Sequence, residues 1–136
     1  MADVNPESLY PYTWREAEKH KWIESEKAGR DLGDPAIRDW EELYLWRFSK
    51  ERWLEHISGR RFWLEYDPNY YGLLNRMFHP DALLVERIVD RFKSGAENLD
   101  IILWACDWKI PEKDVLDILQ VININSCRLP GVRKQP

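Results

Sequence analysis

The sequence predicts an all-α fold, a compact bundle of five to six helices organised around one long central helix over residues 35–58. Three observations favour this class: prolines stand where the predicted helices begin, glycines stand where they end, and apolar residues recur at helical spacing between them. The prolines are Pro35, Pro68, Pro80 and Pro111, and the glycines are Gly29, Gly59 and Gly95. Because these signals agree along the whole chain, we predict helices throughout.

The chain is expected to begin with an irregular arm and continue into a first helix. Two prolines disfavour helix within residues 1–12. The sequence TWRE, which begins at Thr13, matches a Ser/Thr-x-x-Glu capping box, and Gly29 suits a helix end. We therefore predict a helix over residues 13–28.

The short connection over residues 29–33 predicts that the first helix and the long helix form an antiparallel hairpin. Placing residues about 100° apart puts Trp14 on the inner face of the first helix, with Trp22 at the edge of that face. Counting back along both helices brings Trp22 near Leu43 and Trp46. We therefore expect a tryptophan-rich seam between the two helices.

The long helix has clear ends in the sequence. Asp34 can cap the first turn, Pro35 suits the first helical position, and Gly59 tolerates the left-handed conformation that stops a helix. Residues 35–58 would span about 36 Å. Apolar residues cover well over half of the circumference, so this helix is expected to pack on more than one side, against its own chain or a second one.

The second half of the chain is expected to supply the remaining helices. Residues 60–66 alternate in polarity but have no second strand to pair with, which favours an extended segment or a helical continuation. Further helices are predicted to begin at Asp67, His79 and Pro111. Residues 97–108 are nearly all apolar, and we expect them to form a buried helix.

Length and composition predict a single helical domain over residues 13–125, followed by a basic flexible tail over 126–136. The 136 residues suffice for one core, and 44% of them are hydrophobic, which excludes a disordered chain. The tail contains three basic residues and no acidic residue. We expect it to lie free or along the surface.

A cytoplasmic protein is the expectation from charge, cysteines and targeting signals. The net charge of −4 gives no general attraction to nucleic acid or to an anionic membrane. Cys106, expected to be a buried thiol, and Cys127, in the tail, suit a reducing compartment. The first residues do not match a signal peptide, and the most apolar segment, 99–106, is too short to cross a bilayer.

Motifs for metal or cofactor chemistry are absent from the sequence, so we predict no cofactor, no metal ligand and no catalytic residue. None of the three histidines has a Glu three positions earlier, as a di-iron bundle requires, and neither histidines nor cysteines have zinc-site spacing. The best acid–base candidates are Glu51, Glu55 and His56, which would make a small Glu/His enzyme an alternative. Charged rows on helices are more often solvated surface, and we favour that reading.

A helix-turn-helix transcriptional regulator is a second alternative, because residues 99–122 predict two helices joined by a tight turn. The second helix would read the DNA, yet it begins with Glu112, Asp114 and Asp117 against Lys113 alone. Acidic groups at that end repel phosphates, so nucleic acid is disfavoured as a partner.

The favoured function is a non-catalytic protein–protein interaction, as an accessory or assembly subunit. The partner would be another protein or a second copy of this chain. The sequence contains 8 Trp, 6 Tyr and 4 Phe, and aromatic and arginine side chains are common anchors of interfaces. The predicted partner-binding residues are Trp40, Trp53, Arg60, Arg61 and Trp63.

Overall fold

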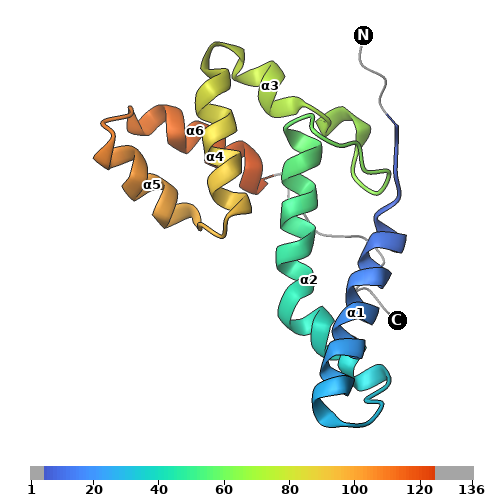
Figure 1. Cartoon of the computed structure of the whole chain (residues 1–136). Coiled ribbons are helices and arrows are strands. Elements are labelled where there is room, and N and C mark those ends of the chain that lie inside the picture. The colour runs from blue at the N-terminus through green and yellow to red at the C-terminus, as the bar shows by residue number, and fades with distance from the viewer. Residues whose placement is uncertain (1–4, 125–136) are drawn as a thin grey trace.

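The computed structural model describes residues 5–124 and has the all-α architecture that the sequence predicts. Its α-helices are α1 (Leu9–Ala28), α2 (Asp34–Ile57), α3 (Leu73–Met77), α4 (Ala82–Lys93), α5 (Asn98–Asp107) and α6 (Glu112–Ile124). Two 3₁₀ turns, η1 (Pro68–Tyr70) and η2 (His79–Asp81), precede α3 and α4. Figure 1 shows α2 with α1 along one side and the group α4 to α6 on the other. The expected tail over 126–136, with Cys127, lies outside the described residues.

The first helix begins at Leu9, so the expected start at Thr13 is wrong, and residues 9–12 of the expected irregular arm over 1–12 are helical. Ser8 is the cap, and its hydroxyl oxygen accepts a hydrogen bond of 3.2 Å from an amide of the first turn. Pro11 stands within that first turn, where its missing N–H leaves no bond unmade. Thr13 lies inside the helix and donates its hydroxyl to the carbonyl of Leu9 at 2.8 Å.

The helices α1 and α2 pack as the predicted hairpin, but the expected tryptophan seam between them is wrong. Leu9, Thr13 and Ala17, spaced four residues apart, form the buried stripe of α1. Trp14 follows Thr13 by about 100° around the helix, and both Trp14 and Trp22 are exposed. The buried side of α1 is therefore formed by this stripe, and the two indoles lie mostly in solvent.

The long helix α2 is fully buried at its C-terminal end and only partly covered over the rest of its length. Gly33 rather than Asp34 is its N-cap, and the helix ends at Ile57, just before Gly59 with φ of 77°. All five residues over 53–57 are buried. Leu43 and Trp46, near the middle of the helix, are exposed, whereas Ala36 and Trp40 nearer its start are buried. The chain thus covers the apolar arc of α2 fully near its C-terminus and leaves part of it uncovered near its middle.

The helix α5 is not buried, which corrects the expectation for residues 97–108. Only Ile101 and Ala105 of α5 are buried, whereas Leu99 is 64% and Leu103 is 54% exposed, and the thiol of Cys106 is exposed as well. Figure 1 places α5 at the edge of the bundle, farthest from α1. A helix at the edge buries one face only, although its sequence is apolar on both.

Candidate functional site

The three predicted partner-binding tryptophans lie in the core, so they are not surface anchors. Trp40 is 5%, Trp53 is 2% and Trp63 is 0% exposed. The indole of Trp53 donates to the carbonyl of Ile122 at 3.2 Å, which joins α2 to α6. The ring of Trp40 packs edge-on against Phe48, with 5.8 Å between centroids. These side chains could reach a partner only if the core opened.

Arg61, a fourth predicted anchor, is bound within its own chain. Its guanidinium donates to Oε2 of Glu7 from Nη2 at 2.7 Å and from Nε at 3.2 Å. It also lies 5.2 Å from the ring centre of Tyr12 and 4.4 Å from that of Trp63. The hydroxyl of Tyr12 donates to the other oxygen of Glu7 at 2.6 Å. Hydrogen bonds from Tyr12 and then Arg61 lower the pKa of Glu7, and the bond to Glu7 raises the pKa of Arg61.

Arg60, the last predicted anchor, pairs with Asp90 of α4 at 3.0 Å. Its side chain is partly exposed. The pair ties the segment that follows α2 to α4. Of the five predicted residues, only Arg60 and Arg61 have partly exposed side chains, at 31% and 38%, and both are already paired within the chain.

Residues 60–66 are irregular: a parallel β-bridge joins Trp63 to Glu7, and a turn over residues 64–65 follows, so the expected extended segment is confined to the residues around Trp63. The amide of Glu7 donates to the carbonyl of Phe62 at 3.1 Å, and the amide of Leu64 donates to the carbonyl of Glu7 at 2.9 Å. Beside the bridge, the carboxylate of Glu65 accepts from the amide of Leu9 at 2.6 Å. The segment that follows α2 thus supplies hydrogen-bond partners for the residues at the start of α1.

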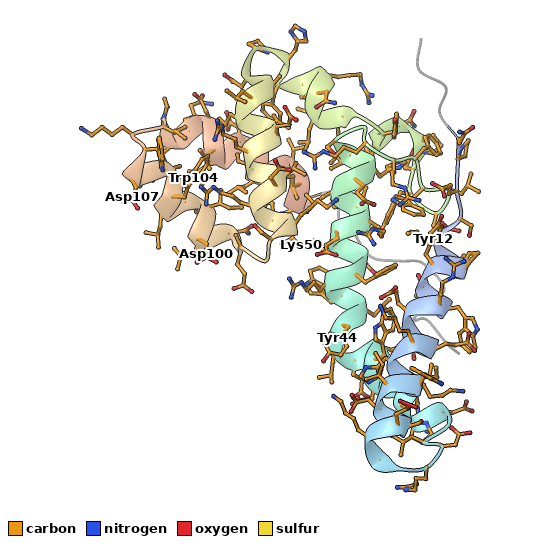
Figure 2. All side chains as sticks on the ribbon, viewed as in Figure 1. Tyr12, Tyr44, Lys50, Asp100, Trp104 and Asp107 are labelled. Atoms are coloured by element: carbon orange, nitrogen blue, oxygen red, sulfur yellow. The ribbon has the colours of Figure 1, made fainter. Side chains whose placement is uncertain are left out.

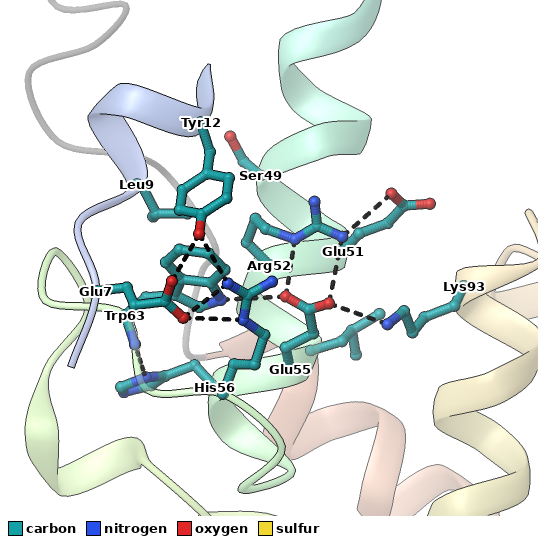
Figure 3. A network of polar contacts seen from close by, with 12 residues as sticks. Glu7, Leu9, Tyr12, Ser49, Glu51, Arg52, Glu55, His56, Trp63 and Lys93 are labelled. Atoms are coloured by element: carbon teal, nitrogen blue, oxygen red, sulfur yellow. Dashed lines mark hydrogen bonds and ion pairs between the residues drawn. The ribbon is translucent and has the colours of Figure 1, made fainter. Parts of the chain in front are cut away.

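Glu55 is a buried carboxylate whose bonds are all made within the chain (Figure 3). One oxygen, Oε1, lies 2.8 Å from Nε of Arg52 and accepts from the indole of Trp63 at 3.1 Å. The other, Oε2, accepts from Nζ of Lys93 on α4 at 3.0 Å. Glu51, one turn earlier, is only partly buried and lies 3.7 Å from Arg52. Glu55 therefore joins α2, α4 and the segment over residues 60–66.

His56 is fully buried, and both ring nitrogens bond to backbone groups. Nδ1 accepts from the amide of Trp63 at 3.1 Å, so Nε2 carries the proton and donates to the carbonyl of Asp67 at 2.9 Å. Burial lowers the pKa of His56, and the bond to Asp67 opposes this only in part. Rings of Phe62 and Tyr71 pack at centroid distances of 5.0 and 5.5 Å.

The three acid–base candidates do not share one accessible site. Glu55 and His56 lie in the core, while Glu51 lines a notch of about 210 Å³ between α2 and the junction of α4 with α5. A general base must reach the proton of a substrate, and neither nitrogen of His56 is free to do so. The notch is lined by Trp46, Arg47, Lys50, Glu51, Phe92, Gly95, Ala96 and Glu97.

Four other tryptophans lie on the surface, a feature that the sequence did not reveal. Trp14 is 55%, Trp22 is 64%, Trp46 is 55% and Trp108 is 72% exposed. The sequence gives the number of tryptophans, but its pattern of apolar residues does not separate the exposed indoles from the buried ones. Tryptophan side chains are common anchors of protein interfaces, so each of these indoles is a candidate contact residue.

The side-chain geometry and the helices of residues 5–124 bear on metal sites and on membrane spans. Among residues 5–124, no three His, Cys, Asp or Glu side chains lie together as a metal site requires. None of the helices formed there combines the length and the apolar character needed to cross a membrane. Comparisons with protein-family models, with curated proteins and with solved structures find nothing that this chain matches.

Proposed function

We propose that this chain is a non-catalytic accessory or assembly subunit that binds a protein partner through the exposed apolar side chains of its α1–α2 hairpin. These side chains are Trp14, Trp22, Leu43 and Trp46, and we call them the hairpin surface. The observation that carries the proposal is their exposure, each above half of the side chain's full surface. Tryptophan and leucine gain most from being covered, because each removes a large apolar area from water.

The hairpin is also built to present such a surface. Figure 1 shows α1 and the first half of α2 projecting away from the remaining helices. The turn between them is fixed by side-chain bonds, since Asp31 accepts from the amide of Gly33 at 2.9 Å and Ser25 accepts from the amide of Leu32 at 3.0 Å. A rigid hairpin loses little conformational entropy on binding, which favours affinity.

Two alternative functions have less support. A Glu/His enzyme would need access to Glu55 and His56, and their burial argues against it. A helix-turn-helix regulator would use α6, whose Lys113 is paired with Asp117 at 2.7 Å and so offers little to phosphate. The expected cytoplasmic location stays a prediction.

The test compares the double variant Trp14→Ser/Trp22→Ser with the control Trp108→Ser, which removes an equally exposed indole outside the hairpin. Full-length proteins are used to retain partners from an extract of the source, and light scattering gives their mass in solution. Circular dichroism checks the fold of each variant. A partner, or a second copy, bound by wild type and by the control but lost from the double variant supports the proposal. If all three proteins bind the same partners, or wild type is a monomer that retains none, the proposal is wrong.

A further inference from the structure

The outer side of α5 carries an exposed apolar stripe that is separate from the hairpin surface. Leu99, Leu103 and Cys106 are spaced by four and three residues, so they lie on one face of the helix. Both leucines are more than half exposed. The opposite face, with Ile101 and Ala105, is buried. The helix is thus amphipathic toward the core and apolar again toward solvent.

Acidic side chains surround this stripe. Residues 97–108 contain Glu97, Asp100 and Asp107 and neither lysine nor arginine. Figure 2 shows Asp100 and Asp107 at opposite ends of α5. On the side toward α6, Cys106 shares a narrow cleft with the exposed Glu112. Acids therefore lie along the stripe and at its edge.

The cations near the stripe are Arg91, Lys113 and the exposed Lys109, two residues after Asp107, and they are fewer than the acids. Arg91 of α4 lies over the ring of Trp104 at 4.2 Å, on the side of α5 that faces α4. Lys113 is paired with Asp117 on α6. Glu97 and Asp100 form a capping box with the backbone of α5, which uses both carboxylates as hydrogen-bond acceptors.

We propose that the outer face of α5 docks a basic amphipathic helix of a partner protein. The apolar side of that helix packs on Leu99 and Leu103, and its lysines or arginines lie toward Asp100, Asp107 and Glu112. The ten residues of α5 span about 15 Å, enough for three turns of a packed helix. A second copy of α5 fits poorly, because it would bring the same acids against each other.

The probe is a labelled synthetic peptide of about 18 residues, with leucines on one helical face and lysines on the other. Its binding to the full-length protein is followed by fluorescence anisotropy at two salt concentrations. One control peptide has the same composition in scrambled order, and the other has glutamate in place of lysine. We expect the lysine peptide alone to bind, and to bind more weakly at the higher salt concentration.

Protein variants locate the binding surface. Leu99→Ser/Leu103→Ser should weaken the lysine peptide by about tenfold or more, and Asp107→Lys by a few fold. Leu83→Ser, which removes an equally exposed leucine from α4, is the matched control and should bind as wild type does. Circular dichroism confirms that each variant is folded.

Several results would overturn the proposal. Equal binding of the scrambled peptide, or unchanged binding by the α5 variants, would show that charge alone attracts the probe. A dimer that Leu99→Ser/Leu103→Ser converts to monomers would identify a second copy as the occupant. If Arg128→Glu/Arg133→Glu/Lys134→Glu raises the affinity for the peptide, the chain's own basic tail is the occupant.

Discussion

The backbone amide of Trp63 donates a hydrogen bond to Nδ1 of His56 at 3.1 Å, and this contact fixes the imidazole as its neutral tautomer. The bond also holds the segment over residues 60–66 against the C-terminal end of α2. Protonation of Nδ1 would place two donors against each other inside the core. The hydrogen bond therefore makes the fold sensitive to acid.

We predict that the free energy of unfolding falls as pH drops below the ordinary histidine pKa of 6.5. The folded pKa of His56 is lowered, so below pH 6.5 the unfolded chain binds a proton that the folded chain does not. The slope from this group approaches about 1.4 kcal/mol per pH unit until the folded pKa is reached. Stability from His56 is thus fully present above pH 6.5 and lost below it.

Urea unfolding between pH 7.5 and pH 5 measures this slope. His56→Gln should remove the dependence, while His79→Gln, which changes an exposed histidine, should leave it in place. A wild-type slope that His56→Gln does not alter would assign the acid sensitivity to another group. Glu7 is not that group, because its lowered pKa moves its titration below 4.5.

Glu55→Gln should destabilise the fold more than Glu51→Gln. Glu55 is buried and holds Arg52, Trp63 and Lys93, and a neutral amide leaves Lys93 without this counter-charge and Arg52 with the more distant Glu51 alone. We expect a loss of about 1–3 kcal/mol for Glu55→Gln and less than about 0.5 kcal/mol for Glu51→Gln. Urea midpoints of the two variants give the comparison. Equal losses would mean that the buried carboxylate has no special role.

Gly59→Ala should cost more than Gly29→Ala, although both residues have similar positive φ, 77° and 72°. A Cβ at Gly59 would lie 3.3 Å from Cα of Gly72 and 3.2 Å from Nδ2 of Asn75, whereas a Cβ at Gly29 meets nothing within 4 Å. The left-handed conformation alone costs about 1–2 kcal/mol for alanine. The difference between the two thermal midpoints therefore isolates the close approach of Gly59 to Gly72. Identical shifts would show that the backbones can separate freely.

Arg61→Lys should lower stability more than Arg60→Lys, although the two arginines are neighbours. Arg61 makes two hydrogen bonds to Glu7 and stacks on Tyr12 and Trp63, which an ammonium cannot reproduce. Arg60 makes one bond to Asp90, which a lysine can replace. Limited proteolysis should cleave the Arg61→Lys protein near residues 5–8 sooner than the Arg60→Lys protein. The same cleavage rate in both variants would show that the contacts of Arg61 with Glu7 do not hold residues 5–8 in place.

The helices could be predicted from sequence because their ends are marked locally. Pro35 and Gly59 lie within two residues of the observed ends of α2. The start of α1 was missed because Pro11 fits the first turn of a helix rather than disfavouring it, and because the bond from the Leu9 amide to Glu65 is not visible in the local sequence. The helix predicted to begin at Asp67 is divided into η1 and α3, and the break occurs at Gly72, whose φ is 68°.

Burial could not be predicted equally well, because it depends on how each helix is rotated against its neighbours. Trp14 and Trp53 have similar local sequence patterns, yet one is exposed and the other is in the core. Leu99 and Leu103 were expected inside because their helix is apolar, and the bundle provides no element to cover them among its described residues. Arg61 was predicted as an anchor since its partner, Glu7, is 54 residues away in sequence.

The hydrogen bond from the Leu9 amide to Glu65 spans 56 residues of sequence. It joins the start of α1 to the segment that follows α2. Amides in the first turn of a helix ordinarily exchange their hydrogen with solvent through fraying. Here the first turn of α1 can fray only after residues 60–66 have moved away. The rate of hydrogen exchange at the Leu9 amide then measures how often residues 60–66 detach from the start of α1.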